Sequence, residues 1–345
     1  MTKKILHIAG CDKFIPPFVQ LVREQFNFDE HEFLLTTGVA AADLIDAKNI
    51  SLSNTTFLAR LKHYFQAIIK MHQADKIILH GLFDIKLVQI LFFTPWLLNK
   101  CYWVMWGGDL YTYQLGCKNW KWKIKEFFRR PVIKNIGHLV TYIDGDVALA
   151  RKWYKAKGEY HECLMYTSNL YQEYKVPKNS SKTINIQVGN SACSSNNHLE
   201  VLKKLLPYKD KNICIYLPLS YGSQEYAKKI IEQGREWFGD KFKPLTDMLP
   251  FNEYLAFLGR IDIAIFNHNR QQAMGNTITL LGLGKTVYIR SDTTQWQFFK
   301  EKGINIRDVE QFNSLDSLNE EKNIEVVKEY FSKSNYLNQL KSLFE

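Results

Sequence analysis

The sequence predicts an α/β protein made of two doubly wound halves, each with a mainly parallel sheet. Short apolar runs alternate along the chain with longer segments of helical spacing, which is the pattern of parallel α/β packing. The chain has 345 residues, enough for two domains that each bury a core. A polar stretch over residues 167–183, with one proline and no clear period, separates two such series.

The first series starts with an apolar run that Gly10 ends, and Pro16 and Pro17 suit the first turn of the helix that follows. Apolar residues between Phe57 and Ile69 recur on one side of a second helix, as they do in a helix that packs on a core. The strands expected in this series are residues 5–9, 33–36, 76–80, 102–106 and 139–143, with helices ending at 26, over 57–71 and from 147 onward.

The second series repeats this alternation from residue 184. Its expected strands are residues 184–188, 213–217, 263–266 and 286–289, and its expected helices are residues 197–206, 223–238, 251–261 and 278–283. Residues 320–345 are charged and amphipathic and should form the last helices. The predicted domains are therefore 1–166, a linker over 167–183, and 184–320, with helices over 321–345 that pack back on the N-terminal domain.

The charge balance narrows the choice of partners. Lys and Arg number 45 against 35 Asp and Glu, a net charge of +10, which favours nucleic acid, an anionic membrane or phosphorylated substrates. The six cysteines show no zinc-site spacing and fit free thiols, so no metal site is expected. The apolar stretch at 87–98 is too short to span a bilayer, and the N-terminus has too short an apolar core for a signal peptide. These features predict a cytoplasmic protein that can touch a membrane.

A strand, a polar loop and a helix start follow one another over residues 262–285. Gly275, Asn276 and Thr277 open the helix, whose first N–H groups have no partner within it and favour an anion. Arg270, in the loop, could add a bidentate contact to a phosphate. An ordinary capped helix start fits the same residues equally well. No G-x-G-x-x-G follows the first strand and no G-x-x-x-x-G-K-[ST] occurs, which argues against a nicotinamide dehydrogenase and a P-loop ATPase.

A basic segment with interleaved aromatic residues lies at 118–130. It holds six cations, one glutamate and four aromatic rings, a composition suited to a lipid headgroup layer. An ordinary helix with snorkelling lysines is the alternative, and no recognised motif supports binding to nucleic acid. The residues expected at a membrane or acceptor are Trp120, Lys121, Trp122, Lys123, Lys125, Arg129 and Arg130.

Four groups of residues follow one another in a recognisable order: residues 80–83, 106–111, 188–191 with 195–198, and 270–272 with 275–277. This ordered set resembles glycosyltransferase family 56, which includes the lipid-linked N-acetylfucosamine-type transferase of enterobacterial common antigen synthesis. The similarity runs from the first strand to Tyr288, with two departures: Gly108 stands where alanine is expected, and the segment after Gln272 differs, so the donor sugar and the acceptor stay open.

The resemblance implies the GT-B architecture, in which two Rossmann-like domains face a cleft. It also implies transfer of an acetamido-dideoxyhexose-type sugar from a dTDP-sugar to an undecaprenyl-diphosphate-linked saccharide. The reaction would take place at the cytoplasmic face of the bacterial inner membrane, with the protein attached peripherally and without a metal or other cofactor.

Glycosyl transfer needs stabilisation of the leaving nucleoside diphosphate, for which helix N-termini and cations are suited. In proteins with this architecture the loop before the phosphate site usually recognises the nucleotide, which places Phe251 near the base and Glu253 at the ribose. For Phe251 we favour a plain core position over this role. The expected donor-binding residues are Gly189, Asn190, Ser191, Tyr216, Ser220, Tyr221, Phe251, Glu253, Asn267, Arg270, Gln271, Gln272, Gly275, Asn276 and Thr277.

The acceptor hydroxyl must lose a proton, and the base is expected in the N-terminal half. Asp109, His80 and Asp12 each follow a predicted strand, where partial burial can tune basicity. We favour Asp109 over His80; an N-cap and a hydrogen-bonded core histidine are the structural alternatives. Two other functions stay open: a nucleotide-sugar epimerase of the same architecture, and a non-catalytic nucleotide- or polyanion-binding protein.

Overall fold

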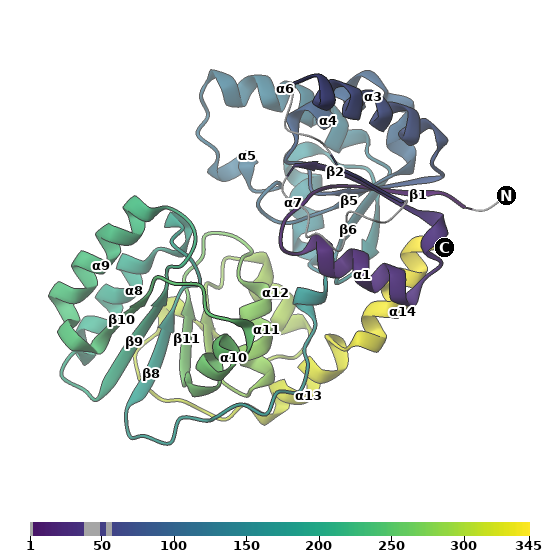
Figure 1. Ribbon diagram of the computed structural model, residues 1–345. Helices are drawn as coiled ribbons and strands as arrows, with labels where there is room; N and C mark the ends of the chain where they lie inside the picture. Colours follow the sequence, from purple (N-terminus) through teal and green to yellow (C-terminus); the bar gives the residue numbers. More distant parts are fainter. Residues whose placement is uncertain (1–2, 38–48, 53–56) are drawn as a thin grey trace. The chain divides into compact units, whose positions relative to one another are not determined.

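The computed structural model describes residues 3–37, 49–52 and 57–345. The chain divides into two compact units: one holds the residues up to Ser168 together with Tyr336–Glu345, and the other holds Asn169–Asn335. Each unit is built on a parallel sheet with helices on its faces (Figure 1). Two α/β domains are what the alternating pattern predicted.

The sheet of the first unit has seven strands in the order β3-β2-β1-β4-β5-β6-β7, and every pairing is parallel. The strand order reverses beside β1, so the carboxyl ends of β1 and β4 flank a switch point, the usual place for a ligand in such sheets. The strands are β1 (Ile5–Gly10), β2 (His31–Thr37), β3 (Ile50–Leu52), β4 (Lys76–His80), β5 (Cys101–Val104), β6 (His138–Thr141) and β7 (Glu159–Glu162).

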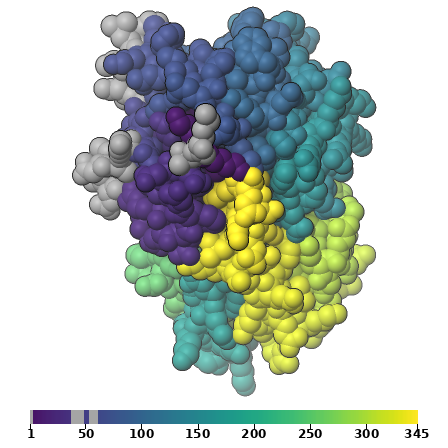
Figure 2. All heavy atoms as spheres, turned by 90° about the vertical axis from the view of Figure 1, so that its right-hand side faces the viewer, coloured from purple at the N-terminus to yellow at the C-terminus, as the bar shows by residue number. Residues whose placement is uncertain are grey.

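The helices of the first unit bury its sheet on both faces. The C-terminal helix lies beside the N-terminal helix, and Phe344 contacts the rings of Phe26 and His31 (Figures 1 and 2). The helices are α1 (Ile15–Gln25), α3 (Phe57–Gln73), α4 (Ile85–Phe93), α5 (Thr112–Leu115), α6 (Trp120–Asn135), α7 (Asp144–Tyr154) and α14 (Lys333–Phe344).

The sheet of the second unit has six parallel strands in the order β10-β9-β8-β11-β12-β13, with its switch point between β8 and β11. Its strands are β8 (Ile184–Val188), β9 (Ile213–Pro218), β10 (Phe242–Leu245), β11 (Ile263–Phe266), β12 (Thr286–Ile289) and β13 (Arg307–Asp308). Its helices are α8 (His198–Leu205), α9 (Gln224–Phe238), α10 (Phe251–Arg260), α11 (Met274–Gly282), α12 (Thr294–Glu301) and α13 (Glu321–Tyr330).

The ends of the second unit differ from the predicted linker and tail. Tyr171 is buried, and its hydroxyl donates to the carbonyl oxygen of Gly282 at 2.7 Å, so part of the polar stretch is fixed to the second unit. The helices over residues 321–345 were predicted to pack on the N-terminal domain. Instead, α13 packs against α11 and belongs to the second unit. Only Tyr336–Glu345 belongs to the first.

One apolar row predicted to pack on the core is exposed. On α3, Leu61, Phe65 and Ile69 are 52%, 65% and 43% exposed, whereas Ala67 and Met71 are buried. The spacing of the three exposed residues places them in one row along the helix. The side chain of Phe57, assigned to the same side, lies outside the described residues.

Candidate active site

A chain of hydrogen bonds runs beneath the carboxyl edge of the first sheet. Trp106 Nε1 donates to the Tyr166 hydroxyl at 2.9 Å, and that hydroxyl lies 2.7 Å from His80 Nδ1. His80 Nε2 lies 3.1 Å from His7 Nδ1, and His7 Nε2 lies 2.9 Å from His31 Nδ1. A single set of neutral tautomers, with hydrogen on each Nε2 of His80 and His7, satisfies every link.

Burial keeps the three histidines of this hydrogen-bonded series neutral. Burial lowers the pKa of His31 to about 4 and that of His80 to about 3, and it lowers the pKa of His7 well below the usual value. Both ring nitrogens of His80 are engaged and the residue is buried, which leaves no nitrogen for an acceptor hydroxyl. The predicted role of His80 as base therefore has no support in this geometry, and the core-histidine alternative describes it better.

The buried histidines should make stability depend on pH. Below a pH of about 6.5 the histidines bind protons in the unfolded chain but stay neutral in the folded protein. As the pH is lowered, the free energy of unfolding should therefore decrease by about 1.4 kcal/mol per pH unit for each such histidine. His31→Gln keeps an acceptor for His7 Nε2–H but does not titrate. Urea unfolding between pH 7 and pH 5 should show a shallower pH dependence for this variant than for wild type. Equal slopes would contradict the prediction.

Asp109 is buried and holds two loops together. Its Oδ2 accepts from the backbone N–H of Leu82 at 3.0 Å and from Trp103 Nε1 at 2.7 Å. Its Oδ1 accepts from the backbone N–H groups of Trp106 and Leu110 at 3.1 and 2.9 Å. Neither oxygen has a free direction toward an acceptor hydroxyl, so the geometry favours a structural role over the predicted role of base.

Asp12 is the third carboxyl-edge candidate and is exposed to solvent. It follows β1, and its Oδ1 accepts from the backbone N–H of Phe14 at 2.9 Å. Partial burial raises its pKa, against the lowering effect of the Phe14 and Ile15 N–H groups and of Lys13. A reachable carboxylate with a raised pKa has the properties of a general base.

Aromatic rings that are half-buried or exposed surround this edge. Phe14 contacts Trp106 edge-to-face with centroids 5.3 Å apart, and Phe83 contacts the same ring at 6.2 Å. Phe83 is 61% exposed. Flat apolar rings beside a carboxylate suit the apolar faces of a sugar ring, so this edge is a candidate acceptor surface.

In the second unit, the loops after β8, β9 and β11 form one polar network. Asn190 Nδ2 donates to the Tyr221 hydroxyl at 2.7 Å, and Gln272 Nε2 donates to Asn190 Oδ1 at 3.2 Å. Ser195 Oγ donates to Gln272 Oε1 at 2.8 Å, and Gln272 Nε2 also lies 3.5 Å from Ser191 Oγ. Four predicted donor residues, Asn190, Ser191, Tyr221 and Gln272, therefore lie together.

Asn196 links these loops but was not among the predicted site residues. It is fully buried, and its Oδ1 accepts from the backbone N–H of Asn190 and lies 2.9 Å from His268 Nε2. Gly189, with φ of +65°, allows His198 and Asn196 to approach, because a Cβ there would lie 2.4 Å from His198 Nε2. The glycine is thus required by packing as well as by its backbone conformation.

Several buried polar atoms at this edge have no hydrogen-bond partner within the described part of the chain. They are Nε2 of His198, Oδ1 of Asn267, Nδ1 of His268 and Nε2 of Gln295. Native proteins rarely leave such atoms unpaired, and a cluster of them is typical of a site for a polar ligand or ordered water. Gln295 also accepts from the backbone N–H of Gln272 through its Oε1, at 3.0 Å.

The start of α11 borders this network. No side chain caps it, and Ala273 before it has φ of +60°. Asn276 hydrogen-bonds to the hydroxyl of the half-buried Tyr254, whereas Arg270 donates from Nη1 to the carbonyl oxygen of Gln271 at 2.9 Å. Thr277 does not fit its predicted role, because its N–H and its hydroxyl both donate to the carbonyl oxygen of Ala273.

The other predicted donor residues are placed differently. Tyr216 and Glu253 line a cavity of about 260 Å³ together with Asn185 and Arg260, which lie toward the amino ends of the strands. The two residues are therefore apart from the network at the carboxyl edge. Phe251 is 64% exposed, so the core position favoured from the sequence is wrong. Ser220, Gln271 and Gly275 are half-buried near the network, and Asn267 Nδ2 donates to Glu200.

The basic helix α6 has one exposed apolar row. Trp120, Ile124 and Phe127 are 66%, 49% and 63% exposed and are spaced to lie on one side of the helix. Lys121, Lys123 and Lys125 are exposed beside them. Among the described helices, none has both the length and the apolar character needed to cross a bilayer.

Three residues of the predicted membrane segment have other roles. Arg129 is buried; it donates to the carbonyl oxygens of Leu82 and Asp109 at 2.7 Å each and forms an ion pair with the buried Glu126. Trp122 turns inward and donates to the carbonyl oxygen of Thr112. Arg130 stacks on Tyr113 and pairs with Glu126, although it is half-exposed.

Comparison with solved structures identifies the fold. The chain resembles a solved glycosyltransferase from Rickettsia africae with 14% identity and a TM-score of 0.63, covering 100% of this chain and 98% of that one. It resembles Anabaena HepE in complex with UDP-glucose with 11% identity and a TM-score of 0.59, covering 99% and 94%. For WaaG, a glycosyltransferase of lipopolysaccharide biosynthesis, the values are 10% and 0.58, covering 98% and 93%. At these identities the likeness establishes the fold, which is GT-B.

The family match covers nearly the whole chain. Residues 3–342 match the family described as 4-alpha-L-fucosyltransferase, glycosyl transferase group 56. The match includes both sheets and the residues of both carboxyl edges. The protein is therefore a glycosyltransferase and belongs to glycosyltransferase family 56.

Proposed function

We propose that this enzyme moves an acetamido-dideoxyhexose-type sugar from a dTDP-sugar to an undecaprenyl-diphosphate-linked saccharide. The observation that carries the donor assignment is the network of Asn190, Tyr221 and Gln272 with the unpaired buried atoms around it. Such a preformed polar site beside an uncapped helix start suits a nucleoside diphosphate. The choice of dTDP and of a lipid-linked acceptor rests on the resemblance of the sequence motifs.

In the proposed mechanism the second unit stabilises the leaving diphosphate and the first unit activates the acceptor. The start of α11 and Arg270 supply positive potential, which is why we expect no metal requirement. Asp12 takes the proton from the acceptor hydroxyl as the new glycosidic bond forms and the bond to the diphosphate breaks. The rings of Phe14, Phe83 and Trp106 orient the acceptor sugar. Asp109 supports the loop that carries Trp106.

A donor panel tests the function. Thermal unfolding is measured with dTDP-, UDP- and GDP-sugars, because a bound donor raises the melting temperature by mass action. We expect the largest rise with dTDP-sugars, and turnover only when a purified undecaprenyl-diphosphate-linked saccharide is added. Conversion of the donor without any acceptor would instead identify an epimerase, and binding without turnover would identify a non-catalytic protein.

Arg270→Ala is expected to lower kcat/KM for the donor by about 10²-fold, the usual cost of losing one charge-stabilising group. Lysine at the same position should restore little activity, since it lacks the planar fork of arginine. Steady-state kinetics with varied donor are the measurement. Arg235→Ala, which removes an exposed arginine on α9, is the matched control. An unchanged kcat/KM in Arg270→Ala would remove Arg270 from the site.

We further propose that α6 attaches the enzyme to the cytoplasmic face of the inner membrane. Trp120, Ile124 and Phe127 can enter the headgroup layer while the neighbouring lysines contact anionic lipid. Exposed rings continue beside α6: Phe92 of α4 contacts Phe127, and Phe93 and Trp96 are 68% and 62% exposed. Single exposed rings are common, but a group this large indicates an interaction surface.

The triple variant Lys121→Glu, Lys123→Glu and Lys125→Glu should lose binding to anionic liposomes, since each lysine contributes about 1 kcal/mol near the surface. Co-sedimentation at low and high salt is the measurement, because an electrostatic attachment weakens with salt. Lys209→Glu, Lys228→Glu and Lys229→Glu change the net charge equally, at exposed lysines of the second unit. If both triple variants bind alike, α6 is an ordinary solvated helix.

A further inference from the structure

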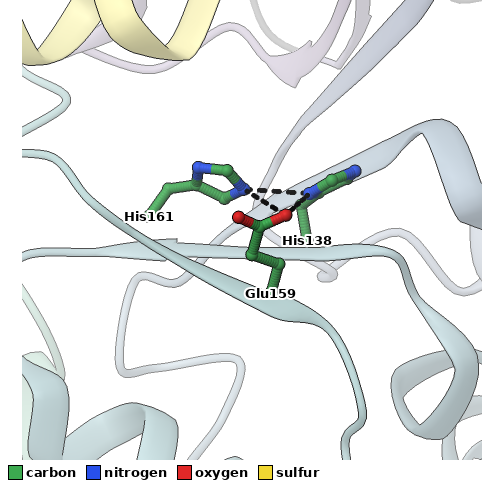
Figure 3. Close-up of side chains that lie close together, drawn as sticks. All are labelled: His138, Glu159 and His161. Carbon is green, nitrogen blue, oxygen red and sulfur yellow. Dashed lines mark hydrogen bonds and ion pairs between the residues drawn. The ribbon is translucent and has the colours of Figure 1, made fainter.

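Two histidines and a glutamate meet on one face of the sheet, on the edge strand β7 and its neighbour β6 (Figure 3). His138 is the direct parallel partner of Glu159, and His161 follows Glu159 by two residues. Alternate residues of a strand point to the same face, so the three side chains converge by construction of the sheet. We propose that His138, Glu159 and His161 form a binding site for a divalent cation of the zinc class.

The distances between the ligand atoms are close to those that such a cation requires. His138 Nδ1 lies 2.9 Å from His161 Nε2, and Glu159 Oε2 lies 3.8 Å from the first nitrogen and 4.0 Å from the second. With metal–ligand bonds of about 2.0–2.2 Å in a tetrahedral site, ligand atoms are about 3.4 Å apart. The three ligand atoms would reach this geometry if each moved by less than about 1 Å. The fourth position would be open to water.

The surroundings favour imidazoles that are ready to bind. The ring of Tyr102 stacks on His138 with centroids 3.9 Å apart and planes 6° apart, which fixes the ring. The backbone of Asn99 hydrogen-bonds to His138, as carbonyl groups do for many metal-ligating histidines. Lys76 is the nearby charge that opposes a cation.

The ligand types select the class of ion. Two imidazoles and one carboxylate suit Zn²⁺, Co²⁺ and Ni²⁺, whereas Mg²⁺ and Ca²⁺ prefer oxygen ligands alone. The cation would join β7, a four-residue strand at the edge of the sheet, to β6 through side chains as well as through the backbone. It would therefore stabilise an edge strand that has a neighbour on one side only.

The site is separate from the proposed chemistry. His138 and Glu159 begin β6 and β7, so they lie at the amino ends of these strands, whereas Asp12, Asp109 and His80 lie at the carboxyl edge. The inference does not rest on the proposed function. Glycosyl transfer by chelator-treated enzyme is expected to continue, and cation binding is measured without any sugar donor.

The test uses full-length protein without a histidine tag, freed of metal with a chelator. Zn²⁺ is titrated in competition with a chromophoric chelator, and Co²⁺ is followed by its visible absorption. Wild type should bind one equivalent and unfold at a higher temperature with Zn²⁺ than without it. Glu159→Gln and His161→Gln should weaken binding at least about tenfold and remove that rise. The side chain of Glu159 is 71% exposed, so its variant is expected to fold.

Two control variants separate this site from incidental binding. Glu162→Gln removes a carboxylate of β7 from the opposite face of the strand, and His72→Gln removes an exposed histidine of α3. Both should bind Zn²⁺ as wild type does. The proposal is overturned if wild type binds no Zn²⁺ at micromolar concentration. It is equally overturned if Glu159→Gln and His161→Gln bind as tightly as the two controls.

Discussion

Replacing Asp12 with asparagine is expected to lower kcat by about 10²–10⁴-fold and to change donor affinity little. Asparagine keeps an oxygen that can accept from the Phe14 N–H group, so the start of α1 should remain intact. The substitution removes only the ability to take up a proton. Steady-state kinetics with the donor and the acceptor varied separately measure the two effects.

The pH profile gives a second reading of the same prediction. A base must be deprotonated, and partial burial raises the pKa of Asp12, so kcat/KM should fall on the acid side at a pH above the ordinary carboxyl range of about 4. This fall of kcat/KM on the acid side should be absent in Asp12→Asn. Asp29→Asn, at an exposed carboxyl in the same unit, should retain both rate and profile. Near-normal kcat in Asp12→Asn would end the assignment.

Asp109→Asn is expected to destabilise the first unit. The wild-type carboxylate accepts four hydrogen bonds from N–H groups, and an amide NH₂ would face donors at one of its two ends. Each buried donor left unpaired costs about 1–3 kcal/mol, so a total of about 2–5 kcal/mol is expected. For a unit of this size the melting temperature should fall on the order of 10 °C. Thermal unfolding by circular dichroism is the measurement.

The same variant separates the two roles considered for Asp109. If the variant unfolds at the wild-type temperature and binds donor normally but loses turnover, Asp109 is the base and the assignment to Asp12 is wrong. Glu126→Gln provides a comparison, because it weakens the ion pair with Arg129 from the other side and leaves the Asp109 carboxylate in place. It should also lower the melting temperature.

The central strands could be predicted from sequence because each is a continuous apolar run that helices bury on both faces. The edge strands could not. Residues Glu159–Glu162 of β7 read Glu-Tyr-His-Glu, and β13 has two residues, so neither carries the apolar signal of a buried strand. Their place in the sheet depends on pairing with a neighbour, which no local pattern encodes.

Part of the candidate site followed from the rule that ligands bind at the carboxyl ends of parallel strands. Asn190, Tyr221 and Gln272 lie in three different loops and still meet, as that rule predicts. Asn196 and Gln295 escaped prediction because their side chains act as links between loops, and such a role depends on contacts distant in sequence.

Arg129 shows where composition misleads. It was assigned to a basic surface because it stands in a run of cations, yet Glu126 lies one helical turn before it and is buried with it. The single glutamate in that run was the available signal, since acidic and basic residues three apart share a helix face. Asp109 has a related limit: its position after two glycines indicates a loop end but not how many N–H groups surround it.

The contacts of Arg129 also set the distance between α6 and the loops that carry Leu82 and Asp109. The guanidinium clamps the carbonyl oxygens of Leu82 and Asp109, and Phe127 of the exposed row lies two residues away on the same helix. The helix that we propose to face lipid is therefore joined by hydrogen bonds to the loops at the proposed acceptor edge. With α6 on a membrane, the proposed acceptor edge would lie at a fixed distance from the bilayer surface. Saccharides whose terminal sugar falls short of that distance, or extends beyond it, would be poor acceptors whatever their composition.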